Sequence, residues 1–240
     1  MQNNLENIIY GIHPITELLK AKKRKLYSIY TTNPEPKIFS QIKKLLPTYV
    51  KINYVDKNIL AKLAQTTDHQ SVVAKVAPFV FRNKFFDPQK HKLLLLLDGI
   101  QDPRNLGAIL RSAFCTNIDG IILPERSSAP INAVALKSSA GLAEHLQIYK
   151  AISTAEIIKE LKKAGYNIYL AAFNGTNALE VKYKTPLCLV IGSEGKGISK
   201  NILSAGEQVT LPQKNSDISY NASVAAGILL FIISSNSKII

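Results

Sequence analysis

Residues 93–107 read LLLLLDGIQDPRNLG, and this stretch decides the fold. Five consecutive leucines end at Asp98-Gly99, and a helical pattern follows from Leu106 to Cys115. An unbroken apolar run of this length is typical of a parallel strand that is buried on both faces, whereas a strand with one face in water alternates apolar and polar residues. The stretch therefore predicts a buried strand, a polar loop and a helix.

The same alternation continues to the end of the chain. Apolar runs recur at residues 120–123, 167–171, 187–191 and 208–211. Helical patterns lie at residues 106–115, 132–141, 155–164 and 198–204, and from 222 onward. Strands that alternate with helices predict a parallel sheet covered by helices on both faces. We therefore expect one α/β domain over residues 93–240.

The first part of the chain predicts a smaller α/β domain over residues 1–78. Its expected strands lie at residues 26–31, 50–55 and 72–77, and its expected helices at 15–20, 38–45 and 57–64. Residues 79–92 contain proline, asparagine and several charges. Such composition is typical of a connection, so we expect a linker there.

Composition excludes several classes of protein. Of the 240 residues, 46% are hydrophobic and 20% are charged, which is ordinary for a globular chain and rules out a disordered or fibrous one. Two distant cysteines without a Cys/His cluster indicate neither a disulfide scaffold nor a metal site. The polar N-terminus, which contains Glu6, is unlike a signal peptide. The longest uncharged run has an apolar centre only at 225–233, too short to span a bilayer. We expect a soluble, cytoplasmic protein.

Positive charge is concentrated in the first part of the chain. The formal net charge is +13, and residues 1–90 hold fifteen basic against six acidic side chains, a net +9. Lys22, Lys23, Arg24 and Lys25 form the densest cluster. Alone, such a cluster is typical of a solvated helix end. The surplus over the whole segment favours a nucleic-acid contact that includes these four residues.

Three loops that follow expected strands carry candidate site residues, because ligands of parallel sheets lie at the carboxyl ends of the strands. They contain Asn105 and the following helix with Arg111, then Gly192-Ser193-Glu194-Gly195-Lys196-Gly197, then Ser219 and Asn221. Each has a structural alternative. The glycines suit a tight turn, and Asn105, Ser219 and Asn221 suit helix N-caps. For Arg111, between residues expected in the core, a buried cation would require a partner or an anionic ligand.

Taken together, these segments resemble a known family. The motifs are Asp102-Pro103-x-Asn105-x-Gly107-x-x-x-Arg111, Gly192-x-Glu194-Gly195-x-Gly197, and Leu211-Pro212 with Ser219-x-Asn221-x-Ser223. In order and spacing they resemble the SpoU (TrmH-type) ribose 2′-O-methyltransferases of the SPOUT superfamily over residues 93–235. Residues 10–14 and 69–74 are similar to the L30e-like substrate-binding domain of many members, with Ser71 at a position where that domain usually has glycine.

The resemblance implies a fold, a cofactor and roles for residues. The fold would be a parallel sheet with a trefoil knot in its C-terminal part, and the active form a homodimer whose site is completed across the interface. The donor would be S-adenosylmethionine, held by Gly192, Leu211, Tyr220, Ala172, Phe173 and Asn174. The catalytic set would be Asn105, Arg111, Glu194, Ser219 and Asn221, with no metal. The family usually has leucine at the position of Tyr220.

The implied activity is methyl transfer to a ribose 2′-hydroxyl in RNA, most similar to the enzymes that modify a guanosine of large-subunit ribosomal RNA. Two alternatives remain open at this point. One is a different substrate, in a transfer-RNA methylase or a ribosome-protecting resistance enzyme. The other is a non-catalytic RNA-binding factor of ribosome assembly, which the intact Arg111 and Asn221 disfavour.

Overall fold

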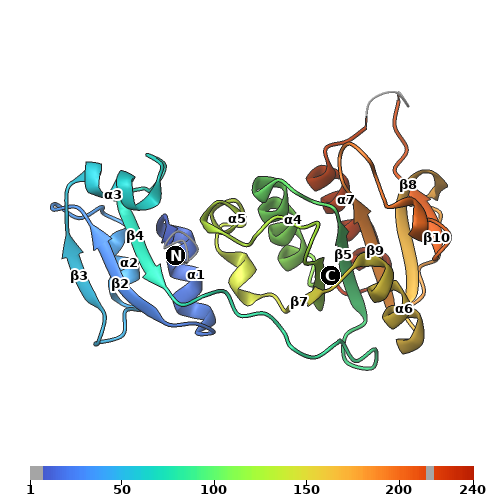
Figure 1. Ribbon diagram of the computed structural model, residues 1–240, viewed down its shortest axis with the longest axis horizontal. Coiled ribbons are helices and arrows are strands. Elements are labelled where there is room, and N and C mark those ends of the chain that lie inside the picture. The colour runs from blue at the N-terminus through green and yellow to red at the C-terminus, as the bar shows by residue number, and fades with distance from the viewer. Residues whose placement is uncertain (1–7, 215–218) are drawn as a thin grey trace. The chain divides into compact units, whose positions relative to one another are not determined.

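The computed structural model describes residues 8–214 and 219–240, and the chain forms two compact units (Figure 1). One unit combines residues up to Val80 with Pro130–His145, and the other combines Phe81–Ala129 with Leu146–Ile240. Residues 130–145 were expected within the continuous second domain. They pack instead with the first unit, so the polypeptide passes between the two units three times.

The first unit is built on a four-stranded sheet with the order β1-β4-β2-β3, in which only β2 and β3 are parallel. Its elements are β1 (Ile8–Tyr10), α1 (Ile12–Ala21), β2 (Leu26–Thr31), α2 (Phe39–Lys43), β3 (Lys51–Tyr54), α3 (Lys57–Ala64), β4 (Val72–Val76), α5 (Ala133–Ser138) and the 3-10 helix η2 (Leu142–His145). Tyr10, Leu60 and Val73 pack in its core. The three-residue β1 is too short to show a periodic pattern and was not predicted.

The second unit is built on a six-stranded parallel sheet with the order β10-β8-β9-β5-β6-β7. Its elements are β5 (Leu93–Asp98), α4 (Pro103–Cys115), β6 (Gly120–Pro124), β7 (Ile148–Ala151), α6 (Thr154–Ala164), β8 (Asn167–Asn177), β9 (Leu187–Gly192), the 3-10 helix η3 (Lys200–Ile202), β10 (Glu207–Thr210) and α7 (Ala222–Asn236). The leucine strand β5 lies between β9 and β6, and all its residues are buried. The predicted α/β class is confirmed.

Two segments of this unit differ from the expected ones. The helix expected at 198–204 is reduced to the three-residue η3, because Ser199, Asn201 and Ser204 are poor helix formers. The edge strand β7 was not predicted, since its Tyr149 and Lys150 interrupt the apolar pattern.

The expected linker at 79–92 is packed against the second unit for much of its length. The amide of Arg82 donates to the carbonyl of Ile148 at 2.7 Å. Phe86 is buried, and a Cβ added at Gly120 would lie 2.2 Å from its ring. The charged residues suggested a free connection, but the phenylalanine side chain belongs to the core.

The most apolar helix is α7, and it packs on β9 and α4. Leu229, Leu230 and Ile233 are buried, and the Ser234 hydroxyl donates to the carbonyl of Thr116 at 2.8 Å. With fifteen residues, α7 is shorter than a bilayer requires. Within residues 8–214 and 219–240, no helix has both the length and the apolar character needed to cross a membrane.

Candidate active site

A cavity of about 430 Å³ lies at the carboxyl ends of β8, β9 and β10 in the second unit. This is the edge at which parallel sheets bind their ligands, and the volume falls in the usual range for cofactor sites. Apolar side chains such as Ile191, Leu203 and Leu229 form part of the wall. All the residues expected to hold the cofactor line it, namely Gly192, Leu211, Tyr220, Ala172, Phe173 and Asn174.

The glycine-rich loop after β9 forms one wall as a tight turn. The backbones of Ser193 and Gly197 exchange two hydrogen bonds, at 3.1 and 2.9 Å, so Glu194 stands in the short turn between them. Gly197 has a φ of +63°, which favours glycine. A Cβ added at Gly192 would lie 2.2 Å from the carbonyl carbon of Gly197. The turn expected from the glycines is therefore present, and it places Glu194 at the mouth of the cavity.

Glu194 is the centre of a polar cluster with Asn105 and Asn221. Its Oε1 accepts a hydrogen bond from Asn105 Nδ2 at 3.0 Å and another from Asn221 Nδ2. Asn221 Nδ2 also donates to Asn105 Oδ1 at 3.2 Å. Three residues separated by up to 116 positions in sequence thus form one cluster beside the cavity, and Ser219 lines the same cavity.

The capping alternatives are settled residue by residue. The N-cap of α4 is Asp102, whose carboxylate accepts from the Arg104 amide at 2.9 Å, so Asn105 is inside the helix and is not a cap. The N-cap of α7 is Asn221, whose Oδ1 accepts from the Ser223 amide at 2.9 Å. Ser219 lies two residues before that cap. Asn221 therefore has both roles, because its Oδ1 caps α7 while its Nδ2 binds Glu194.

Arg111 is exposed on α4, which corrects the expectation that apolar neighbours bury it. Ile109, Leu110 and Ala113 are buried as expected, but Phe114 is 40% exposed and lies on the open side of the helix with Arg111. Among the described residues, Arg111 makes no hydrogen bond or ion pair. An exposed guanidinium without a partner is available to an anionic ligand. Because the side chain is not buried, its burial gives no argument that such a ligand must be present.

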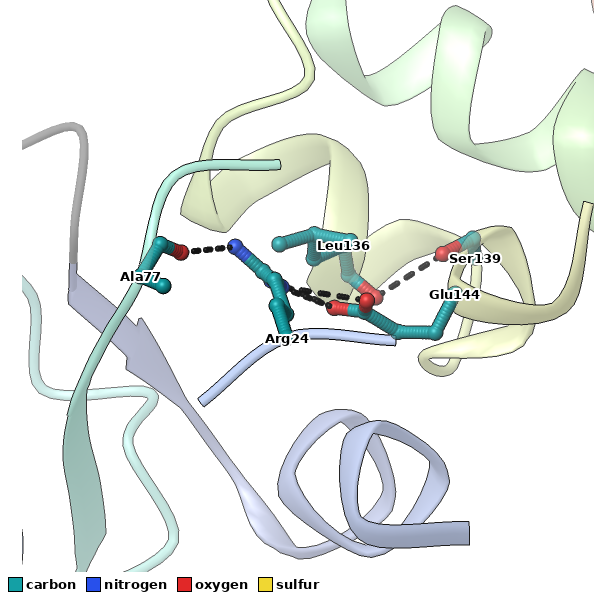
Figure 2. A network of polar contacts seen from close by, with 5 residues as sticks. All are labelled: Arg24, Ala77, Leu136, Ser139 and Glu144. Carbon is teal, nitrogen blue, oxygen red and sulfur yellow. Dashed lines mark hydrogen bonds and ion pairs between the residues drawn. The ribbon is translucent and has the colours of Figure 1, made fainter. Parts of the chain in front are cut away.

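The basic cluster near the end of α1 is only partly available to RNA. Lys22 and Lys25 are exposed. Lys23 Nζ donates to the carbonyl of His145 at 2.8 Å. Figure 2 shows the Arg24 guanidinium directed at the carboxylate of Glu144, an ion pair in which the two side chains are 2% and 3% exposed. The Arg24 side chain is therefore buried in an ion pair, which leaves its guanidinium unavailable to an RNA phosphate, contrary to the expectation.

Two tyrosines beside Lys25 were missed as candidate RNA contacts. Lys25 Nζ lies 5.9 Å from the ring centroid of Tyr27 and 5.3 Å from that of Tyr49, and the two tyrosines are 50% and 60% exposed. Aromatic rings beside cations are the surfaces on which unpaired bases stack. Tyr27 next to the basic cluster was visible in the sequence, but only the fold brings Tyr49 to the same place.

No metal centre is formed by the part of the chain that the structure describes. Within it, no three His, Cys, Asp or Glu side chains are grouped as ligands of an ion. Cys115 and Cys188 are both free, and burial raises the pKa of the Cys188 thiol, which makes it unreactive.

These features define a two-unit α/β protein with a ligand site at the carboxyl ends of its parallel strands, and comparison with known proteins identifies its family. Residues 92–231 match the SpoU rRNA Methylase family, and residues 8–81 match the RNA 2′-O ribose methyltransferase substrate-binding domain. The chain belongs to the SpoU rRNA methylase family.

Named relatives agree with this assignment. A Staphylococcus aureus protein assigned to the TrmH family of tRNA/rRNA methyltransferases is 34% identical over 94% of this chain and 90% of its own length. The 23S rRNA (guanosine-2′-O-)-methyltransferase RlmB of Pasteurella multocida is 31% identical over 94% of this chain and 96% of its own. The fold is shared with the SpoU methyltransferase AviRb of Streptomyces viridochromogenes, crystallised with S-adenosylmethionine, at 20% identity and a TM-score of 0.80 over 96% of this chain and 90% of that one.

Proposed function

We propose that this chain transfers a methyl group from S-adenosylmethionine to a ribose 2′-hydroxyl of RNA. The observation that carries the proposal is the Asn105–Glu194–Asn221 cluster at the mouth of the cavity, within a chain of the SpoU family. The motifs that the resemblance rests on are thus adjacent in space, as a single site requires.

The residues around the cavity suit S-adenosylmethionine. Leu211 and the apolar wall would hold the adenine, while backbone groups of the loop at Gly192 would bind its polar edge. Glu194 supplies a carboxylate for a ligand that carries a positive charge on sulfur. When bound, S-adenosylmethionine supplies a methyl group that is open to attack by a nucleophile.

The chain's own residues would orient the ribose and stabilise charge on its oxygen. A guanidinium keeps its proton in proteins and is therefore a poor base. Arg111 would instead bind a neighbouring phosphate and the 2′-oxygen, stabilising negative charge as it develops. Asn105, Glu194 and Ser219 would align the nucleotide with the cavity. The hydroxyl proton would pass to water late in the reaction, or to an oxygen of that phosphate.

We propose large-subunit ribosomal RNA as the substrate and a guanosine as the modified nucleotide, in a cytoplasmic enzyme. Support comes from the match to the substrate-binding domain and from the named guanosine-specific relative. Mapping of 2′-O-methyl sites in RNA from cells that lack the gene tests this. One missing methyl group in large-subunit RNA is expected, and a missing group in transfer RNA would contradict it.

The RNA-contact surface that we propose on the first unit consists of Lys22, Lys25, Tyr27 and Tyr49. Its lysines would meet phosphates and its tyrosine rings would stack on unpaired bases, a contact worth about 1–3 kcal/mol per base. The net +9 of residues 1–90 complements a polyanion.

Replacing Lys22 and Lys25 together by glutamine is expected to weaken RNA binding and to flatten its salt dependence. Each lost phosphate contact removes roughly 0.7–0.9 from the slope of log affinity against log salt. Binding titrations over a range of salt concentrations measure this slope. Lys43→Gln is the matched control, because Lys43 is exposed but pairs with Glu35 at 2.7 Å. An equal slope in wild type and double variant would show that the two lysines do not contact RNA and only form a solvated helix end.

We also propose that the enzyme is a homodimer that joins through α7 and α4. Val224, Ile228 and Phe231 are spaced by four and three residues along α7, and they are 48%, 37% and 60% exposed. Phe114, also exposed, lies on the adjacent α4 with Arg111. An apolar stripe of this kind on a helix suits burial against a second copy.

Phe231→Lys is expected to make the protein monomeric and to abolish methyl transfer, because a charge in the stripe cannot be buried unpaired. Light scattering measures the mass in solution. Leu179→Lys is the control, since Leu179 is 64% exposed outside the two helices and its replacement should leave the dimer intact. A Phe231→Lys protein of unchanged dimeric mass would rule out this interface.

A further inference from the structure

Asp98 is a buried carboxylate that the proposed chemistry does not use. It is the last residue of β5 and only 3% exposed. Its Oδ1 accepts a hydrogen bond from the Thr154 hydroxyl, and its Oδ2 accepts one from the Ser199 amide, both at 2.7 Å. Within the described residues no cation forms an ion pair with it. Burying a carboxylate without a cation is costly, and its two hydrogen bonds offset this cost. We therefore ask which part of the structure these bonds hold in place.

The Ser199 bond joins Asp98 to the far end of the glycine-rich loop. That loop leaves the sheet at Gly192, which is the direct neighbour of Asp98 in the β5–β9 pairing. The mutual hydrogen bonds of Ser193 and Gly197 close its base. Ser199 follows two residues later, so Asp98 is adjacent to the start of the loop and bonded just beyond its end. One carboxylate thereby anchors the loop to the carboxyl end of β5.

The position of this loop determines the position of Glu194. Glu194 Oε1 accepts hydrogen bonds from Asn105 Nδ2 and Asn221 Nδ2. Both bonds form only when the loop holds Glu194 within reach of the two asparagines. The same loop contributes Gly192 and Ile198 to the cavity wall. A shift of its far end would move both the carboxylate and the wall.

We propose that Asp98 is a positioning residue of the methyl transfer reaction, holding the Gly192–Ser199 loop through the Ser199 amide. The inference rests on the proposed function. Asp98 contacts neither donor nor RNA, and it acts through Glu194 and the backbone of the loop. Thr154, at the first turn of α6, donates a hydrogen bond to the other carboxylate oxygen, Oδ1, which does not bind the loop.

The test compares Asp98→Ala, Asp98→Asn and Thr154→Val in the full chain. Asp98→Ala leaves the Ser199 amide unpaired and should lower kcat about a hundredfold, the loss expected for a misplacement of roughly 1 Å, with weaker binding of S-adenosylmethionine. Asp98→Asn keeps an acceptor for that amide and should recover most of kcat. Thr154→Val removes only the other hydrogen bond and should retain the wild-type kcat, even where its unfolding temperature falls.

The readouts separate a positioning role from a structural one. kcat and donor affinity are measured well below the unfolding temperature of each variant. Equal kcat values in wild type and Asp98→Ala would overturn the proposal, as would equal losses in Asp98→Ala and Thr154→Val. If Asp98→Ala does not fold, Asp98→Asn decides, because a loss of kcat of about a hundredfold in that variant would contradict rescue by the retained acceptor. Absence of transfer by the wild type would refute the proposed function itself, whatever the variants do.

Discussion

Replacing Arg111 by alanine is expected to lower the rate of methyl transfer about a hundred- to a thousandfold, the usual cost of removing a contact that stabilises transition-state charge. Affinity for S-adenosylmethionine should stay nearly unchanged, because Arg111 does not line the cavity. The side chain is exposed and without a partner among the described residues, so its loss should not destabilise the fold. Single-turnover transfer of labelled methyl to ribosomal RNA measures the rate, with calorimetry for the donor.

Two further variants make the Arg111 prediction specific. Arg111→Lys should restore little activity, because a point charge does not reproduce a planar fork that spans phosphate and hydroxyl. Arg104→Ala removes another exposed arginine from α4 and should cost much less. An equal loss of rate in Arg104→Ala and Arg111→Ala would indicate that both arginines act only by attracting RNA electrostatically. A fully active Arg111→Ala would refute the proposed role.

Replacing Glu144 by alanine is expected to destabilise the protein by about 3–5 kcal/mol, the usual cost of removing one partner from a buried ion pair. The variant leaves the Arg24 guanidinium buried without a carboxylate, while its hydrogen bond to the Ala77 carbonyl, at 3.0 Å, and its contact with the Phe79 ring remain. For a chain of this size the midpoint of thermal unfolding should fall by on the order of 10 °C. Scanning calorimetry of the full chain measures the change.

Removing both partners should be much milder than removing one. Burial raises the pKa of Glu144 above its ordinary value of 4.5, and the attraction and hydrogen bonds of Arg24 offset this only in part. A carboxyl group whose pKa is raised on folding contributes its stability below the unfolded value and loses it as pH rises through the folded value. The pair therefore adds little net stability at neutral pH.

Two control variants make the ion-pair prediction specific. Arg24→Met with Glu144→Leu should retain most of the stability. Glu35→Ala, which breaks the more exposed pair with Lys43, should cost at most about 1 kcal/mol. If Glu144→Ala unfolds at the wild-type temperature, the pair does not hold residues 130–145 in the first unit.

The fold was predictable where the pattern of burial is simple. The leucine run gave β5 because a strand covered on both faces has no polar positions, and β2 and α3 were expected within their observed bounds. The glycine motif predicted a tight turn, because glycine tolerates close backbone approach. In the structure Gly192 and Gly197 do approach closely there. The trefoil knot is a matter of chain threading and stays a prediction.

Long-range packing was not predictable from local patterns. Arg24 belongs to a run of four basic residues, and nothing near it in sequence indicates that Glu144, 120 positions away, buries it. Arg111 was expected in the core because four neighbours are apolar, yet one of them, Phe114 on its side of α4, is exposed. Ser71 has a φ of +57°, a conformation that favours glycine, which agrees with the glycine usual at this position in similar proteins.

The position of the transferred methyl group tests the central claim most directly. The purified full chain is incubated with S-adenosylmethionine that carries a labelled methyl group and with large-subunit ribosomal RNA lacking modifications, and the RNA is then digested to nucleosides. We predict that the label is recovered in a 2′-O-methylated nucleoside, with guanine as its base. Label in a methylated base, or no transfer by a protein that binds the donor, would contradict the proposed function.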